Sequence, residues 1–134
     1  MAVRKIEHVG IHSSNLEASI EFYTKVIGLD YLETLDHTNG VIKLAFLSFP
    51  GSRDTEIELI QGYDGDVHPE GLVHHVAFAV DDIEEEYERL AKLNVAALDS
   101  EITRLPNGSR YFFFHGPDGE SIEFFQSTRG GNAQ

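Results

Sequence analysis

The sequence predicts an α+β fold made of two tandem βαβββ modules, and three observations support this prediction. The pentapeptide Ile-Glu-Leu-Ile-Gln at 57–61 returns 65 residues later as Ile-Glu-Phe-Phe-Gln at 122–126. The tetrapeptide Ile-Glu-His-Val at 6–9 returns 67 residues later as Val-His-His-Val at 73–76. Between these anchors, strand and helix patterns follow the same order twice. A near-constant spacing indicates one supersecondary unit that is present in two copies.

The first module is expected at about residues 4–61. It opens with a loosely alternating strand at 5–12. Ser14 and Glu17 have the spacing of a capping box, and apolar residues at helical spacing follow as far as Gly28. Asn39-Gly40 is a tight-turn signal between strands. The remaining strands are predicted at 29–35, 41–49 and 55–61.

The second module is expected at about residues 73–127, after a Gly-rich and acidic linker at 62–72, so that residues 4–127 form a single domain. A strand at 73–80 leads to Asp81-Asp82, which can cap the next helix. The apolar face of that helix is predicted to contain Ile83, Tyr87, Leu90 and Leu93 or Asn94. The strands that follow are predicted at 95–98, 109–115 and 120–126.

The composition limits the classes of partner. Hydrophobic residues make up 41% of the 134 residues and charged residues 25%, which is typical of a globular protein. The net charge of −13 argues against nucleic acid and anionic membranes as partners. The absence of cysteine excludes disulfides, zinc fingers and a catalytic thiol, and it suits a cytoplasmic location. We expect no signal peptide, because the N-terminus lacks a long apolar run.

Period-2 alternation places one His and one Glu of each module on the same kind of sheet face. His8 and Glu58 fall on the polar faces of their strands, and His75 and Glu123 occupy the equivalent positions in the second module. The opposite faces are apolar and should contact the helices. His74 should point to that other face. Two His and two Glu in paired positions on a cavity face have the composition of a metal site.

The chain resembles the vicinal oxygen chelate superfamily, in its glyoxalase I branch. The resemblance runs from Ile6 to Gln126. The phrase at 19–29 and the ending Gly-Pro-Asp-Gly-Glu-Ser-Ile-Glu-Phe are its most specific parts. The stretches that carry the resemblance are 7–11, 19–29, 56–59, 75–78 and 116–124.

The resemblance implies the fold of the glyoxalase, bleomycin resistance and dioxygenase proteins, with curled mixed sheets around a concave metal site. It implies that His8, Glu58, His75 and Glu123 bind one divalent ion, with nickel or cobalt favoured and zinc, iron or manganese as alternatives. The implied activity is that of a lactoylglutathione lyase-like enzyme, which acts on a hemithioacetal or a similar substrate by proton transfer through a metal-bound enediolate. Glu123 matches the catalytic base and Glu58 the opposing carboxylate. A homodimer with shared sites is also implied.

Two positions depart from the pattern of the glutathione-using enzymes. His12 stands where they have an Arg, and Gly62 stands where they have an Asn. The thiol of the substrate and the metal therefore stay open, as does the role of Arg53, Arg104 and Arg110 toward an anionic substrate. One alternative is an acyl-CoA epimerase, although that branch has Gln at the position of Glu58. The other alternative is a non-enzymatic small-molecule-binding or resistance protein, although such relatives lack the ligands.

Overall fold

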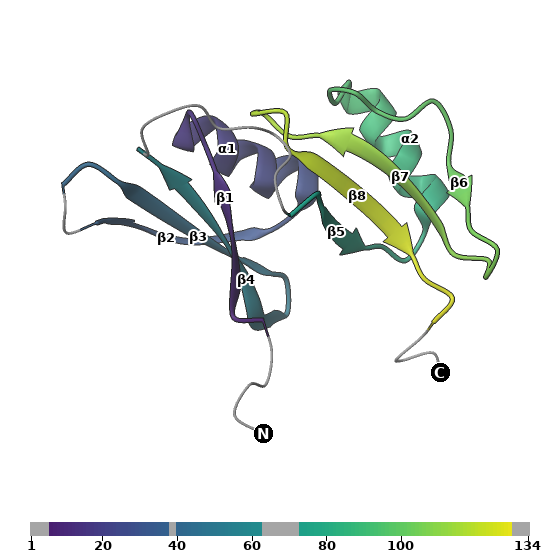
Figure 1. The fold of residues 1–134 in the computed structure, drawn as a ribbon, viewed down its shortest axis with the longest axis horizontal. Coiled ribbons are helices and arrows are strands. Elements are labelled where there is room, and N and C mark those ends of the chain that lie inside the picture. The colour runs from purple at the N-terminus through teal and green to yellow at the C-terminus, as the bar shows by residue number, and fades with distance from the viewer. Residues whose placement is uncertain (1–5, 38–39, 63–72, 130–134) are drawn as a thin grey trace. The chain divides into compact units, whose positions relative to one another are not determined.

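The two halves of the chain fold into separate compact units. A computed structural model describes residues 6–37, 40–62 and 73–129. The first unit spans Met1–Val67 and the second His68–Gln134. In the described part of each unit, a four-stranded mixed sheet has a helix packed against one face, and the sheets are curled but not closed (Figure 1).

The first unit has the predicted order of one strand, a helix and three strands. Strand β1 pairs in parallel with β4, and the sheet order is β1-β4-β3-β2. Helix α1 contacts β3 and β4. The elements are β1 (His8–His12), α1 (Leu16–Phe22), the π-helical turn η1 (Tyr23–Ile27), β2 (Asp30–Asp36), β3 (Lys43–Phe49) and β4 (Ser52–Gln61).

The second unit repeats this topology. Strand β5 pairs in parallel with β8, the sheet order is β5-β8-β7-β6, and helix α2 contacts β7 and β8. The βαβββ order predicted for each half is therefore confirmed. The elements are β5 (Val76–Ala79), α2 (Ile83–Leu93), β6 (Thr103–Arg104), β7 (Arg110–His115) and β8 (Ser121–Gln126). No helix in the described ranges is both long enough and apolar enough to cross a membrane.

The helix-facing side of each sheet forms the core, as the alternation predicts. Ile57 and Leu59 of β4 are buried, and so are the equivalent Ile122 and Phe124 of β8. Burial of such side chains contributes about 1.5–3 kcal/mol each. The residue between each pair, Glu58 or Glu123, projects from the opposite face because the side-chain period of a strand is two.

The glutamine that ends each copy of the pentapeptide holds the start of the helix in its own unit. The side-chain oxygen of Gln61 accepts a hydrogen bond from the backbone N–H of Leu16, at 2.5 Å. The side-chain oxygen of Gln126 accepts one from the backbone N–H of Ile83, at 2.7 Å. The first N–H groups of a helix have no partner within the helix. The repeated glutamine thus has a structural role in both units.

The helix ends were predicted with mixed success. Asp82 caps α2 as expected, because its side chain accepts from the N–H of Glu85. The capping box at Ser14 is wrong: Asn15 is the N-cap of α1, and its Oδ1 accepts from the N–H of Ala18 at 3.1 Å. Gly28 ends the first helix in a left-handed conformation (φ 96°), as predicted, but after the π-helical turn η1, which the spacing does not reveal.

The strand predicted at 95–98 is also wrong. Ala96 makes only an isolated bridge to His115, and Ala97 has a positive φ of 55°, which interrupts an extended strand. The short strand β6 takes the place beside β7. Leu93 does not belong to the buried face of α2, since it is half exposed.

The first strand of the second unit is shorter than predicted, because it begins at Val76 rather than at residue 73. A turn lies at Asn107-Gly108, where the N–H of Gly108 donates to the carbonyl of Leu105. Residues 4, 5, 39 and 63–72, which include most of the predicted linker, lie outside the described residues.

Candidate functional site

The first candidate pair is His8 and Glu58. Nε2 of His8 lies 3.4 Å from Oε1 of Glu58. The two residues come from adjacent parallel strands, in which Gly10 is the register partner of Glu58. His8 precedes Gly10 by two residues and therefore shares its face. A Cβ atom at Gly10 would lie 3.1 Å from Cδ1 of Ile60 and 3.5 Å from Oε1 of Glu58, so the glycine leaves room beside the carboxylate.

The second candidate pair, His75 and Glu123, has the same construction. Nε2 of His75 lies 3.0 Å from Oε1 of Glu123. Ala77 of β5 is the register partner of Glu123, so the imidazole again comes from two residues earlier. Glu123 is buried, with 7% of its surface exposed, although it is a charged residue. Charged side chains are almost never buried unless they are paired or bind a ligand.

The distances within both pairs fit two ligands of one metal ion. Nitrogen and oxygen ligands bind at about 2.0–2.2 Å, which places two neighbouring ligands at right angles roughly 3 Å apart. Each unit offers one imidazole and one carboxylate, which is half of a four-ligand set. In the described ranges no group of three or more His, Asp or Glu side chains could hold a metal ion. The convergence of all four ligands therefore stays a prediction.

The electrostatic environments of the two pairs differ. Burial raises the pKa of the Glu123 carboxyl, and the neighbouring His75 imidazole opposes this rise. The hydrogen bond to Glu7 raises the pKa of His8, with an additional contribution from the charge of Glu58 and opposition from desolvation. The buried carboxylate of Glu123 is therefore harder to ionise in the metal-free protein than an exposed carboxylate.

In each pair the second imidazole nitrogen, Nδ1, faces away from the carboxylate of the pair and also has a partner. Nδ1 of His8 lies 2.6 Å from Oε1 of Glu7, and Nδ1 of His75 lies 2.9 Å from Nδ1 of His74. The expectation that His74 points to the opposite face is wrong. Strand alternation does not apply there, because β5 begins only at Val76. The sequence repeat could have revealed both partners, since Glu7 and His74 occupy equivalent positions.

Aromatic side chains flank both carboxylates. Phe46 is the register partner of Glu58, and Phe113 is the register partner of Glu123. The ring of Phe113 meets His75 edge to face, with centroids 5.0 Å apart, and it also contacts Tyr111. Phe46 of β3 and Phe113 of β7 therefore occupy equivalent register positions in the two units.

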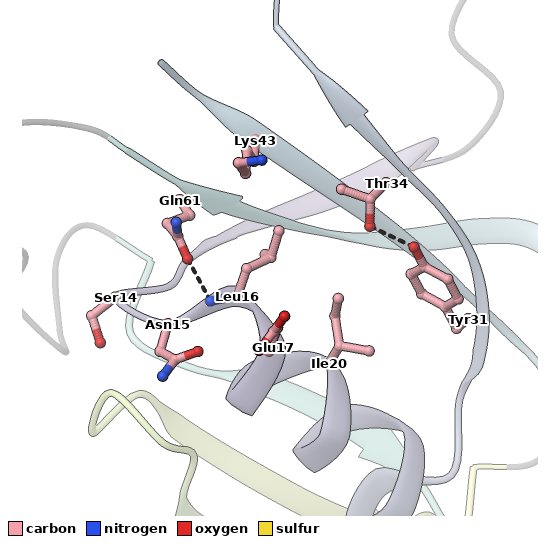
Figure 2. Close-up of a pocket in the computed structure, with 9 residues that line it drawn as sticks. All are labelled: Ser14, Asn15, Leu16, Glu17, Ile20, Tyr31, Thr34, Lys43 and Gln61. Carbon is pink, nitrogen blue, oxygen red and sulfur yellow. Dashed lines mark hydrogen bonds between the residues drawn. The ribbon is translucent and has the colours of Figure 1, made fainter. Parts of the chain in front are cut away.

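A groove of about 610 Å³ lies elsewhere in the first unit, between α1 and the sheet (Figure 2). It is bounded by Leu16 and Ile20 of the helix and by Thr34 and Gln61 of the sheet. Gln61 projects from the helix-facing side of β4, opposite to Glu58, because the two positions differ by three residues. The groove is therefore separate from the candidate pair His8 and Glu58.

The structure gives a physical reason for one departure from the glutathione-binding pattern. Gly62 has a φ of 114°, and a Cβ atom there would lie 2.8 Å from the carbonyl oxygen of Val41 and 3.1 Å from Cα of Ile42. Both neighbours are backbone atoms, which cannot move aside without shifting the chain. A side chain at position 62 would therefore be strained and would require this backbone to shift. His12 is exposed on β1 and has no such restriction.

The two tandem βαβββ modules and the paired His and Glu positions define a class of protein fold. The model of the Glyoxalase/Bleomycin resistance protein/Dioxygenase superfamily matches residues 5–124. The chain belongs to this superfamily.

Relatives with similar sequences cover nearly the whole chain. The Bacillus subtilis (strain 168) protein named "Uncharacterized protein YwbC" is 53% identical, over 92% of this chain and 98% of its own. The lactoylglutathione lyase of Neisseria meningitidis serogroup A is 32% identical, over 94% of this chain and 93% of its own. The mitochondrial methylmalonyl-CoA epimerase of Dictyostelium discoideum is 28% identical, over 86% and 72%.

Solved structures support the same assignment. A glyoxalase family protein from Enterococcus faecalis has a TM-score of 0.77 at 25% identity and covers 94% of this chain and 100% of its own. The trypanothione-dependent glyoxalase I of Leishmania major has a TM-score of 0.72 at 27% identity and covers 92% and 87%.

Proposed function

We propose that this protein is a metal-dependent lyase or isomerase of the glyoxalase I type, which moves a proton between adjacent carbons of a hemithioacetal or a similar substrate. The observation that carries the proposal is the repeated imidazole–carboxylate pair, at 3.4 Å in one unit and 3.0 Å in the other. The names of the lactoylglutathione lyase and glyoxalase I relatives support the reaction class.

In the proposed mechanism His8, Glu58, His75 and Glu123 bind one divalent ion, with nickel or cobalt favoured for a site of two imidazoles and two carboxylates. The bound ion would acidify the C–H beside a coordinated oxygen and stabilise the negative charge that develops. Glu123 accepts this proton and returns it to the neighbouring carbon. Its burial shields the carboxylate from bulk water, which favours proton transfer within the site. Glu58 is the opposing carboxylate.

Each unit supplies only two ligands, so the proposal requires that first and second units combine. We propose that they do so in a homodimer with two shared sites, in the cytoplasm. A dimer with two-fold symmetry would bring the first unit of each chain to the second unit of its partner. The same two-fold axis would then generate both sites.

Metal titration tests the proposed function directly. The protein, stripped with chelator, should bind one divalent ion per chain, with nickel or cobalt bound more tightly than magnesium, because imidazole ligands favour these metals. Isothermal titration and elemental analysis measure the stoichiometry. His75→Ala is the matched variant, and it should lose the tight site. A parent protein that binds no divalent ion would contradict the proposal.

The second candidate function is acyl-CoA epimerisation, which the 28% identical methylmalonyl-CoA epimerase favours. Both reactions begin with removal of a proton next to a carbonyl carbon. Incorporation of solvent deuterium, measured with a panel of hemithioacetals and acyl-CoA thioesters, distinguishes the two. A small-molecule-binding protein would bind a compound but exchange no proton with any of them.

The geometry of Gly62 leads to a prediction about the stability of variants that restore the glutathione-binding pattern. Gly62→Asn, which restores the glutathione pattern, should destabilise the fold by about 1–3 kcal/mol, because a side chain is forced into a left-handed backbone against Val41. Gly62→Ala should be similarly harmful, since the collision begins at Cβ. His12→Arg is the control, and its effect should stay within about 0.5 kcal/mol. Thermal unfolding measures all three. A stable Gly62→Asn protein would show that this position can accept the amide.

A further inference from the structure

The residues that contact Nδ1 of His8 and Nδ1 of His75 differ in type, although they occupy equivalent positions of the repeat. Glu7 and His74 occupy equivalent positions, 67 residues apart, and each contacts Nδ1 of the following histidine. In both units Nε2 of that histidine points to the carboxylate of the pair. The same arrangement is therefore built once with a carboxylate partner and once with an imidazole partner.

A carboxylate partner fixes the tautomer of a histidine. The ionised Glu7 side chain can only accept hydrogen bonds, so Nδ1 of His8 must carry the proton in their 2.6 Å contact. In the neutral imidazole Nε2 then has the free lone pair, which is the form that binds a metal ion. Glu7 therefore prepares His8 as an Nε2 ligand and increases its basicity.

An imidazole partner leaves the choice open. The two Nδ1 atoms of His74 and His75 are 2.9 Å apart, so one of them carries the hydrogen and the other accepts it. If His75 donates, its Nε2 is free for a metal ion. If His74 donates, the neutral His75 carries its hydrogen on Nε2, where it can point at Glu123 instead. Only one of these two arrangements is compatible with ligation.

We propose that Glu7 and His74 are positioning residues of unequal strength, so that the first half-site is set for metal binding and the second must select its tautomer when the metal binds. This inference rests on the proposed metal function. The first half-site should be the stronger donor. Both partners are solvent-accessible, which limits the expected effects to the lower part of the 10–100-fold range known for outer partners of metal ligands.

Metal affinity tests the inequality. Glu7→Ala should weaken metal binding by about tenfold, and Glu7→Gln by less, because its amide oxygen still accepts from Nδ1. His74→Glu should strengthen binding, because it makes the second half-site a copy of the first. Glu17→Gln removes a charge from an exposed position on α1 and should leave the affinity unchanged. Unchanged affinity in both Glu7→Ala and His74→Glu would overturn the proposal.

The tautomers can be read in the metal-free protein, which separates this proposal from the proposed function. Side-chain ¹⁵N NMR of the neutral imidazoles should show His8 with its hydrogen on Nδ1, and Glu7→Ala should move it toward Nε2. A parent His8 with its hydrogen on Nε2 would refute the role of Glu7, whether or not the protein binds metal. Addition of diamagnetic zinc should then shift His75 to the Nδ1–H form. A parent that takes up no metal, but shows the expected His8 tautomer, would instead refute the metal function.

Discussion

Glu123→Gln is expected to lower turnover by ~10²–10⁴-fold, the usual contribution of a general base. The amide has nearly the shape of the carboxylate, and its oxygen can still coordinate weakly, but it cannot accept a proton. Some metal should therefore remain bound while proton exchange stops. The measurements are the rate with the best substrate and the incorporation of solvent deuterium into the product.

Glu58→Gln is the matched control for this experiment, because it changes the equivalent carboxylate of the other unit. It should reduce metal affinity more than it reduces the rate of the metal-loaded enzyme. A dead Glu58→Gln beside an active Glu123→Gln would assign the base to Glu58. Full activity in both variants would contradict the proton-transfer mechanism.

The stability of the metal-free protein gives a second readout for Glu123→Gln. Because burial raises the folded-state pKa of Glu123, ionisation of this group destabilises the folded protein as the pH rises through that pKa. Protonation at lower pH removes the penalty. The neutral Gln should therefore leave the melting temperature at neutral pH unchanged or higher, which shows that the lost activity is not caused by unfolding.

Much of the fold was predictable because the signals are local and occur twice. The apolar partners of the repeated pentapeptide identify the buried face of β4 and β8, and this face is buried as expected. Gly28 marks the end of the first helix and Asp82 the start of α2. Their preferences for a left-handed backbone and for N-capping are local and do not depend on the rest of the fold. The strand at 95–98 failed because the left-handed backbone of Ala97 leaves no mark in a sequence of ordinary apolar residues.

The candidate pairs were predictable to the extent that strands alternate. Glu58 and Glu123 lie within regular strands, so the sequence assigned their faces correctly. His74 lies just before the first regular residue of β5, and alternation gave the wrong face there. The contact of His74 with His75 depends on a local backbone path that no periodicity encodes. The closed space at Gly62 likewise depends on the approach of Val41, which lies in the segment before β3.

The same two-unit architecture allows the proposed sharing of sites between chains to be tested by mixing chains. His8→Ala removes a ligand from the first unit, and His75→Ala removes one from the second. Each variant alone should lose tight metal binding and activity, because three ligands remain at every site. If each site combines the first unit of one chain with the second unit of its partner, a dimer of the two variants has one site with all four ligands. Such a heterodimer, purified through two different tags, should recover about half of the parent activity.

A reciprocal heterodimer provides the decisive control. A chain that carries both substitutions, paired with a parent chain, has one damaged half in each shared site and should be inactive. If each site instead lay within one chain, the results would reverse: the first heterodimer would be inactive, and the second would retain about half of the activity through its parent chain. Metal content per dimer should follow the activity in both cases. The two heterodimers thus give opposite outcomes for the two arrangements, and neither outcome depends on which substrate the enzyme uses.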